Sequence, residues 1–429
     1  MKTFAMVDVA LLKQAIVDQN TLVLPKHLYQ RQAFAQLSTF SVLPHVVVIS
    51  GIRRCGKSTL LQQLRQQQTE QAYYLNFDDD RLLGFHVEDF QTMLEIFIEL
   101  YGEQSTFYFD EIQNIEGWER FVRRLHDQGK KVYVTGSNAN MLSRELGTRL
   151  TGRYVQCELY PLSFKEIFMH HKPLLVEKST FTTAEKSIIK QHFSDYLLQG
   201  GLPEYVATQS TEVLQLLYQN ILYRDIIVRY RLQELPLKEL MYFLVSNVGK
   251  EVSFGKLAKV VGVKNGSTVS EYCHYLENSY LNFLINRYDP SVKRQMLFNK
   301  KTYAIDQGMA RAIGFRPSDD RGRMLENVVF IELKRRGCDV YFHRQQKECD
   351  FLIRKGTRIV EAIQVCQQMT DADTQKREYA GLVEAMQYAD LTQGLILTED
   401  TFADESVEAD SKHYTIAIRP IWWWLLQQA

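Results

Sequence analysis

The sequence lacks any run of about twenty apolar residues, the length that a helix needs to cross a bilayer. Its amino-terminal residues also lack the apolar core and cleavage site of a secretory signal, because Asp8 interrupts the apolar run. The six cysteines include no Cys-x-x-Cys pair, which disfavours a zinc ribbon and suits a reducing compartment better than a disulfide scaffold. These absences together predict a cytoplasmic protein without a membrane partner.

Net charge is also absent, because the chain carries 51 basic and 51 acidic side chains. Such a chain has no global attraction to nucleic acid or to acidic membranes, so any binding of this kind must come from a local patch. The 429 residues are too many for one ordinary core. We therefore expect about two to four domains.

The stretch VVVISGIRRCGKSTLLQQL, residues 46–64, predicts a phosphate-binding turn between a buried strand and a helix. From Gly51 to Ser58 it fits G-x-x-x-x-G-K-[ST], whose backbone N–H groups cradle a triphosphate at a helix amino terminus. We expect Lys57 to reach the β- and γ-phosphates and Ser58 to bind Mg²⁺. Cys55 is interpreted as an incidental small residue rather than an oxidation switch. The expected nucleotide-binding residues are Gly51, Ile52, Arg53, Arg54, Cys55, Gly56, Lys57, Ser58 and Thr59.

A second motif, TFYFDEIQ, places two carboxylates at the carboxyl end of a predicted strand. Asp110 and Glu111 take the positions of a Walker B pair. We expect Asp110 to hold the hydration shell of Mg²⁺ and Glu111 to orient or deprotonate the water that attacks the γ-phosphate. An ordinary acidic turn is the alternative, but the phosphate loop upstream favours the catalytic interpretation.

The segment TGSNANMLSRELGTRLTGRYV carries sensor and arginine candidates. Asn138 stands where a polar side chain can touch the γ-phosphate or the attacking water, and Ser137 is the weaker alternative. An arginine beyond it could stabilise transition-state charge in its own subunit or, as a finger, in a neighbour, which would require self-association. Arg153 is the first candidate, Arg149 the second, and Arg144 lies in the same segment. Solvated surface arginines are an equal alternative.

Strand and helix patterns alternate after Pro44, which predicts a doubly wound α/β fold with ligands at the carboxyl ends of the strands. The five parallel strands are expected at residues 46–50, 72–77, 106–109, 131–135 and 154–159. The pattern becomes helical from Ser163, then gives short helices and a β pair, and finally returns to mixed α/β.

These motifs carry a family resemblance over nearly the whole chain. The matching stretches are GIRRCGKSTLL, YLNFDDDRL, YFDEIQ, TGSNANMLSREL, LTGRYV, GGLPEYV, LYRDII and ENVVFIELKRRG. The chain resembles the bacterial and archaeal AAA+-related ATPases that pair a P-loop core with a C-terminal domain of unknown function. The resemblance implies ATP hydrolysis in an AAA+-like core, a winged-helix module and a C-terminal fold similar to PD-(D/E)XK nucleases.

Five segments are expected along the chain on this basis. They are an N-terminal helical segment (1–44), a P-loop AAA+-like core (45–162), a helical segment (163–236), a winged-helix domain (237–310) and a C-terminal PD-(D/E)XK-like domain (311–429).

The winged-helix expectation agrees with the local pattern. Ser253 predicts a helix start, Ser267 or Thr268 starts a second helix, and strands are expected at 284–288 and 296–305. The second helix has no arginine that could bond guanine. Flanking basic residues could still meet phosphates: Lys259, Lys264, Lys293, Arg294, Lys300 and Lys301. Duplex-DNA binding and a packing role between domains or subunits therefore both stay open.

The C-terminal domain departs from the nuclease pattern, in which a helix acid, a strand Asp and an E-x-K on the next strand converge on Mg²⁺. Glu326 would be the helix acid and Asp350 the central one. Side chains alternate between the two faces of a strand, so the next strand places Gln364 and Cys366 where the Glu and the Lys of the nuclease motif should stand. Glu361 falls on the opposite face of that strand. This degenerate site predicts a retained fold with a recognition or regulatory role, and no nuclease activity.

The sequence as a whole predicts an ATPase that uses ATP and Mg²⁺ as a molecular switch or motor, with appended domains that recognise a partner or nucleic acid. One alternative is a nucleotide-gated binding protein with little turnover. A DNA nuclease governed by ATP is the third hypothesis.

Overall fold

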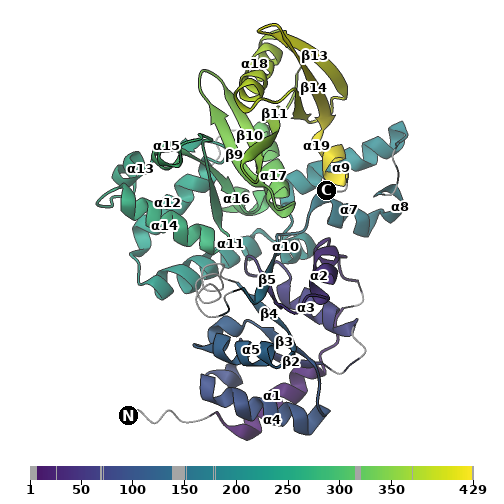
Figure 1. Cartoon of the computed structure of the whole chain (residues 1–429), viewed down its shortest axis with the longest axis vertical. Helices are drawn as coiled ribbons and strands as arrows, with labels where there is room; N and C mark the ends of the chain where they lie inside the picture. The colour runs from purple at the N-terminus through teal and green to yellow at the C-terminus, as the bar shows by residue number, and fades with distance from the viewer. Residues whose placement is uncertain are drawn as a thin grey trace. The chain divides into compact units, whose positions relative to one another are not determined.

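The computed structural model describes residues 7–25, 27–67, 70, 72–137, 150, 152–176, 178, 180–314, 320–369 and 371–427. The chain divides into two compact units, Met1–Leu159 and Tyr160–Ala429 (Figure 1). Across these described ranges, no helix is both long and apolar enough to cross a membrane.

The first unit is built on a five-stranded, all-parallel sheet with strand order β2-β3-β4-β1-β5. Its strands are β1 (Val46–Ser50), β2 (Tyr73–Asn76), β3 (Thr106–Asp110), β4 (Lys131–Gly136) and β5 (Tyr154–Glu158). The prediction of a five-stranded parallel sheet is confirmed. Because the strands are parallel, β1, β3 and β4 end at the same edge of the sheet.

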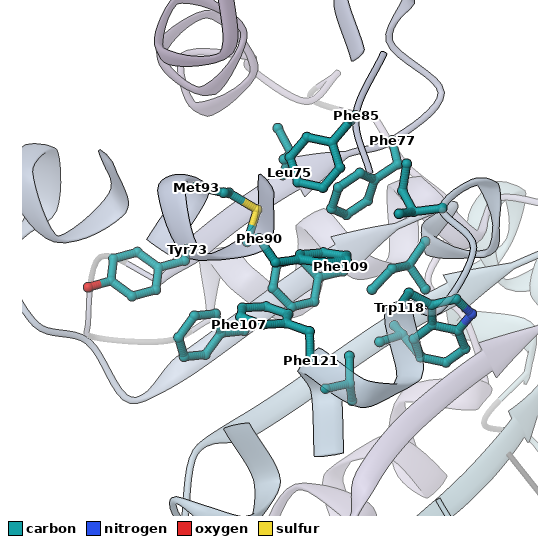
Figure 2. Packing of buried hydrophobic residues seen from close by; sticks show 14 of the residues in the cluster. Tyr73, Leu75, Phe77, Phe85, Phe90, Met93, Phe107, Phe109, Trp118 and Phe121 are labelled. Carbon is teal, nitrogen blue, oxygen red and sulfur yellow. The ribbon is translucent and has the colours of Figure 1, made fainter. Parts of the chain in front are cut away.

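An aromatic core packs around β2 and β3, and Figure 2 shows Tyr73, Phe107 and Phe109 of these strands among its side chains. Phe90 stacks on Phe121 with ring centroids 4.5 Å apart, and Phe109 lies within the same cluster. Such pairs add about 0.5–1.5 kcal/mol beyond burial, so the core holds the end of β3 firmly. The helices of this unit are α1 (Val9–Asn20), α2 (Ala33–Ser41), α3 (Lys57–Gln66), η1 (Asp80–Leu82), η2 (Val87–Asp89), α4 (Phe90–Tyr101), η3 (Ile112–Asn114) and α5 (Trp118–Asp127).

The second unit begins with helices and a small antiparallel sheet of order β6-β8-β7. Its strands are β6 (Glu251–Val252), β7 (Asn282–Asn286) and β8 (Lys300–Ala304). The helices are α7 (Phe164–His171), α8 (Pro173–Val176), α9 (Thr183–Gln199), α10 (Pro203–Thr208), α11 (Thr211–Asn220), the π-helical η4 (Ile221–Val228), α12 (Glu234–Ser246), α13 (Phe254–Val260), α14 (Gly266–Asn278), α15 (Val292–Leu297) and α16 (Gln307–Ile313).

Two local predictions in this region are corrected. The cap of α14 is Asn265, whose side-chain oxygen accepts the N–H of Thr268 at 3.1 Å, rather than Ser267 or Thr268. Met296 lies in α15 and not in a strand, because a short helix fills the connection between β7 and β8.

The second unit ends in a mixed six-stranded sheet of order β13-β14-β12-β11-β10-β9. Its strands are β9 (Asp339–Arg344), β10 (Glu348–Lys355), β11 (Arg358–Val365), β12 (Gln393–Thr398), β13 (Ala403–Ala409) and β14 (Lys412–Pro420). The helices are α17 (Arg321–Arg335), α18 (Ala372–Ala389) and α19 (Ile421–Leu426). α18 packs against β10 and β11, and Trp422 of α19 is buried in this unit.

The turn at Gly200 and Gly201 is tied to a buried carboxylate. Asp306 accepts the Gly201 N–H at 2.7 Å and caps α16 through the Met309 N–H at 2.9 Å. A Cβ on Gly200 would lie 2.2 Å from an Asp306 oxygen, so only glycine fits there. The glycine pair in GGLPEYV is therefore required by contacts with distant parts of the chain.

The buried Asp306 carboxyl should make the folding stability of the protein depend on pH. Burial raises its pKa to about 6 from an ordinary value of 3.8, although the backbone N–H donors oppose the shift. The folded chain thus keeps this proton where the unfolded chain has lost it, so the stabilisation is present at low pH and is lost as pH rises through about 6. We expect the thermal midpoint of the wild type to fall relative to that of Asp306→Asn between about pH 4 and pH 7. Parallel pH profiles of the two proteins would contradict this.

Candidate functional site

The loop between β1 and α3 turns at two glycines that no other residue could replace without strain. Gly51 has a φ of +150°, and a Cβ there would lie 2.1 Å from the carbonyl oxygen of Leu159. Gly56 has a φ of +99° and directly precedes α3. The loop and the amino terminus of α3 therefore form the kind of backbone cradle that binds phosphates.

The Lys57 ammonium lies inside this loop. Its side chain is 3% exposed, and Nζ donates to the carbonyl oxygens of Gly51 and Ile52, both at 3.1 Å. A carboxylate oxygen of Glu111 lies 3.8 Å from the same Nζ. Lys57 and Glu111, which are far apart in the sequence, thus meet at the edge where β1 and β3 end.

Asp110 occupies the buried end of β3. It is 0% exposed, and its carboxylate accepts hydrogen bonds from the hydroxyls of Thr135, Tyr74 and Ser58. Burial raises the pKa of Asp110 and the Glu111 charge adds to the shift, whereas Thr135 and Ser58 oppose it. A hydroxyl and a carboxylate that already lie together are oxygen ligands of the kind that Mg²⁺ prefers, so these residues fit the ion.

Glu111 has a strained backbone, with φ of 49° and ψ of 38°. Its N–H donates to the Thr135 hydroxyl at 2.9 Å, and its carboxylate accepts from the Gln113 side-chain amide. A left-handed conformation at a residue other than glycine persists only where its surroundings fix it, and such residues cluster at functional sites. Thr135 is thus a shared partner of both carboxylate residues.

Sequence reasoning missed Thr135 and Gln113. A signal for Thr135 existed, because β3 and β4 pair in parallel with Phe109 opposite Val134, which brings the next residue of β4 beside Asp110. Gln113 gave no comparable signal, since its contact with Glu111 depends on the η3 turn that follows β3.

Replacement of Thr135 by valine is expected to lower Mg²⁺-dependent nucleotide turnover by about 10–100-fold, as the loss of an outer partner of a ligand usually does. Valine keeps the shape but removes the hydroxyl that bonds Asp110 and the Glu111 N–H. Thr135→Ser keeps the hydroxyl and is the matched control. Equal rates in the valine and serine variants would contradict this role.

Three further residues of the phosphate loop, Arg53, Arg54 and Cys55, lie between its two glycines. Arg53 lies 3.9 Å from Asp78, and Arg54 has a φ of +62°. The Cys55 thiol is buried against the carbonyl of Leu159, and burial raises its pKa. A protonated, buried thiol is a poor oxidation switch, which agrees with the interpretation of Cys55 as a packing residue.

The arginine candidates are not assembled around the loop in the described chain. Asn138, Arg144 and Arg149 lie outside the described residues. Arg153 precedes β5 and pairs with Asp127 at 3.1 Å. Because β5 runs parallel to β1, Arg153 lies at the opposite edge of the sheet from the loop, about six residues or ~20 Å away at ~3.3 Å per residue. A role of Arg153 toward another subunit stays a prediction.

Glu326 and Asp350, the two acids predicted for the C-terminal site, come together around a lysine that the sequence analysis assigned elsewhere. Lys301 of β8 is 1% exposed, and its Nζ lies 3.0 Å from Glu326, 2.7 Å from Glu348 and 2.9 Å from Asp350. The prediction that Lys301 meets nucleic-acid phosphates is therefore wrong. Lys300 is half-buried, with its Nζ on the carbonyl of Gln295 at 3.2 Å.

The two β11 candidates of this cluster differ in their contacts. The Gln364 oxygen accepts the Asp350 N–H at 3.2 Å, and its amide donates to Glu378 at 2.6 Å. The Cys366 thiol lies 3.0 Å from the carbonyl oxygen of Gln368. Gln364 thus holds the backbone of Asp350, whereas the Cys366 thiol contacts the backbone two residues further along its own segment.

Comparisons with known proteins now give the family. Residues 44–168 match the family described as "AAA domain", and residues 190–319 match "Domain of unknown function (DUF8612)". The "Uncharacterized protein MJ1544" of Methanocaldococcus jannaschii is 30% identical over 99% of this chain and 98% of its own. An "Uncharacterized protein" of Haemophilus influenzae is 36% identical over 76% of this chain and 83% of its own.

Among solved structures, a chain from "Structure of Drosophila ORC bound to AT-rich DNA and Cdc6" matches 70% of this chain and 92% of its own. The identity is 11% and the TM-score is 0.22. The match along almost the full length of the Methanocaldococcus protein, with an AAA domain around the phosphate loop, shows that the chain belongs to the same AAA+-like P-loop family as that protein.

Proposed function

We propose that this chain is a Mg²⁺-dependent ATPase that works as a molecular switch or motor. The observation that carries the proposal is the meeting of Lys57, Glu111 and the Asp110–Ser58 pair at one sheet edge, next to a loop that cradles phosphates. Membership in a family with an AAA domain supports the same activity.

The residues of the site would divide the work of hydrolysis. The loop N–H groups and Lys57 bind the phosphates, and Ser58 and Asp110 hold Mg²⁺, which when bound neutralises charge that develops on the phosphate oxygens. Glu111 orients a water and takes its proton as the water oxygen bonds to the γ-phosphorus. The bond from that phosphorus to the bridging oxygen breaks, which gives ADP and phosphate. Asn138 remains the proposed sensor of the γ-phosphate. Either Arg153 or Arg149 remains the proposed arginine finger, which would reach the site of a neighbouring subunit through self-association.

For the second unit we propose a winged-helix-like module (237–310) and a nuclease-like domain (311–429). The succession of α13, α14 and the antiparallel β7–β8 pair supports the first of these. Lys259, Lys264, Lys293 and Arg294 are exposed and form the remaining basic candidates for phosphate contact. The exposed face of α14 instead presents Glu271 and His274, which favours packing over base recognition.

The test of the proposed function is phosphate release from ATP, with and without Mg²⁺, and with duplex DNA, single-stranded DNA or RNA at two salt concentrations. We expect turnover that requires Mg²⁺. Any stimulation by nucleic acid through exposed lysines should weaken as salt rises. Bound ATP without phosphate release under every condition would overturn the ATPase and leave a nucleotide-gated binding protein.

The binding protein is the second candidate because of one specific contact. One Glu111 oxygen accepts from the Gln113 side-chain amide, and the other lies 3.8 Å from Lys57 Nζ, so both oxygens face protein groups that compete with a water. If the protein groups win this competition, ATP is held and turned over slowly.

A further inference from the structure

The acidic cluster of the second unit is filled by a side chain from a different sheet. Lys301 extends from β8 of the three-stranded sheet to Glu326 of α17 and to Glu348 and Asp350 of β10. An ammonium has three N–H donors, and three carboxylates lie within 2.7–3.0 Å of this one. Lys301 therefore donates hydrogen bonds to Glu326 and Asp350 and forms a further ion pair with Glu348.

The carboxylates also have fixed partners besides Lys301. The Tyr303 hydroxyl donates to Glu326 at 2.6 Å, and the second oxygen of Asp350 accepts the Val365 N–H at 3.0 Å. These contacts orient the carboxylates of Glu326 and Asp350 toward the same position, and Lys301 Nζ occupies that position. A nuclease-like fold would place Mg²⁺ between such acids at about 2.0–2.1 Å from each oxygen, which leaves no room beside an ammonium. The residues present do not fit the metal.

Electrostatics keep Lys301 charged in this position. Burial by itself would lower its pKa, but Asp350, Glu326 and Glu348 outweigh burial and hold the pKa well above its usual range. The charged lysine therefore offsets part of the negative charge of the acids, and burial together with the Asp350 charge raises the pKa of Glu326 to about 7. Removal of one partner from such a group leaves an uncompensated buried charge, which is strongly destabilising.

We propose that Lys301 is a tethered cation that replaces the divalent metal of the nuclease-like cluster, so that the cluster clamps β8 to α17 and β10 instead of cleaving phosphodiesters. This inference uses the proposed nuclease-like domain but is independent of ATP hydrolysis.

A second contact on the same strand and helix supports the clamp. Asn327, next to Glu326, bonds both backbone groups of Ala304, accepting its N–H at 2.9 Å and donating to its carbonyl at 3.1 Å. β8 is thus fastened to α17 at three points, through Lys301, Tyr303 and Ala304. The small sheet and α17 should consequently move as one body in any rearrangement driven by nucleotide.

The test measures Mn²⁺ binding by electron paramagnetic resonance, together with thermal unfolding, on the full chain without nucleotide. We expect the wild type to show no Mn²⁺ site that depends on Asp350. Lys301→Ala should melt roughly 10 °C lower, should regain stability with Mn²⁺, and should gain a Mn²⁺ site that a further Asp350→Asn change removes. The triple variant Lys301→Met, Glu326→Gln, Asp350→Asn should melt near the wild type and ignore Mn²⁺.

Lys300→Ala, on the same strand, is the matched control: it should gain no Mn²⁺ site, and it should lower the melting temperature far less than Lys301→Ala because its contacts are with neutral groups. A wild-type Mn²⁺ site that Asp350→Asn abolishes would overturn the proposal, and so would a Lys301→Ala variant of undiminished stability. If Lys301→Ala does not fold, the triple variant decides: a stable triple supports charge balance, and an unfolded one contradicts it. None of these results bears on Lys57 or Glu111, so failure here is distinguishable from failure of the ATPase.

Discussion

Replacement of Glu111 by glutamine is expected to lower the rate of ATP hydrolysis by about 10²–10⁴-fold, the usual contribution of a positioned general base. Glutamine has nearly the same shape and can still meet Gln113, but it cannot take a proton from water. Lys57, Ser58 and Asp110 are untouched, so Mg²⁺·ATP should remain bound. Single-turnover hydrolysis and equilibrium ATP binding, measured on the same preparation, separate the two effects.

The control for this experiment is Glu116→Gln, which removes an exposed carboxylate shortly after the same motif. It should leave the hydrolysis rate unchanged. If Glu111→Gln also leaves the rate unchanged, Glu111 is not the base, and the nucleotide-gated binding protein becomes the better account.

Replacement of Gly201 by alanine is expected to destabilise the second unit by more than about 4 kcal/mol, or to prevent its folding. A Cβ on Gly201 would lie 1.9 Å from the carbonyl oxygen of Leu162, and backbone atoms cannot yield as a flexible side chain can. The shift would also break the Leu162 N–H bond to the Gly201 carbonyl at 2.7 Å and displace the N–H that Asp306 accepts. Denaturant unfolding of the variant measures the loss.

Gly255→Ala is the matched control in the same unit. A Cβ there meets nothing within 4 Å, and Gly255 lies in α13, where alanine is favoured over glycine by about 1 kcal/mol. This variant should be as stable as the wild type or more so. Similar losses in both glycine variants would show that the Leu162 contact does not determine stability.

The core of the first unit could be predicted because its signals are local. The five residues of β1 are all buried, as expected of a central parallel strand, and the glycine pattern after it specifies the turn. Parallel strands end at one edge of the sheet, so the position of Asp110 at the end of its strand predicts that it lies beside the loop. Those parts of the site follow from short stretches of sequence.

The parts that could not be predicted depend on contacts between distant segments. Lys301 looks like a basic residue of an exposed strand, and only the packing of β8 against α17 and β10 shows that it is buried among acids. Arg153 is near the loop in the predicted order of elements but lies at the far edge of the sheet. Sequence spacing gives the succession of elements, and it does not give the depth at which a side chain is buried.

The central claim is that the loop around Lys57 binds a triphosphate, and the most direct test is retention of labelled ATP by purified protein in magnesium buffer. The wild type should retain ATP, and Lys57→Ala should weaken retention by at least about tenfold, because the ammonium that meets the β- and γ-phosphates is lost. Equal retention by both proteins, or none by the wild type, would contradict the account.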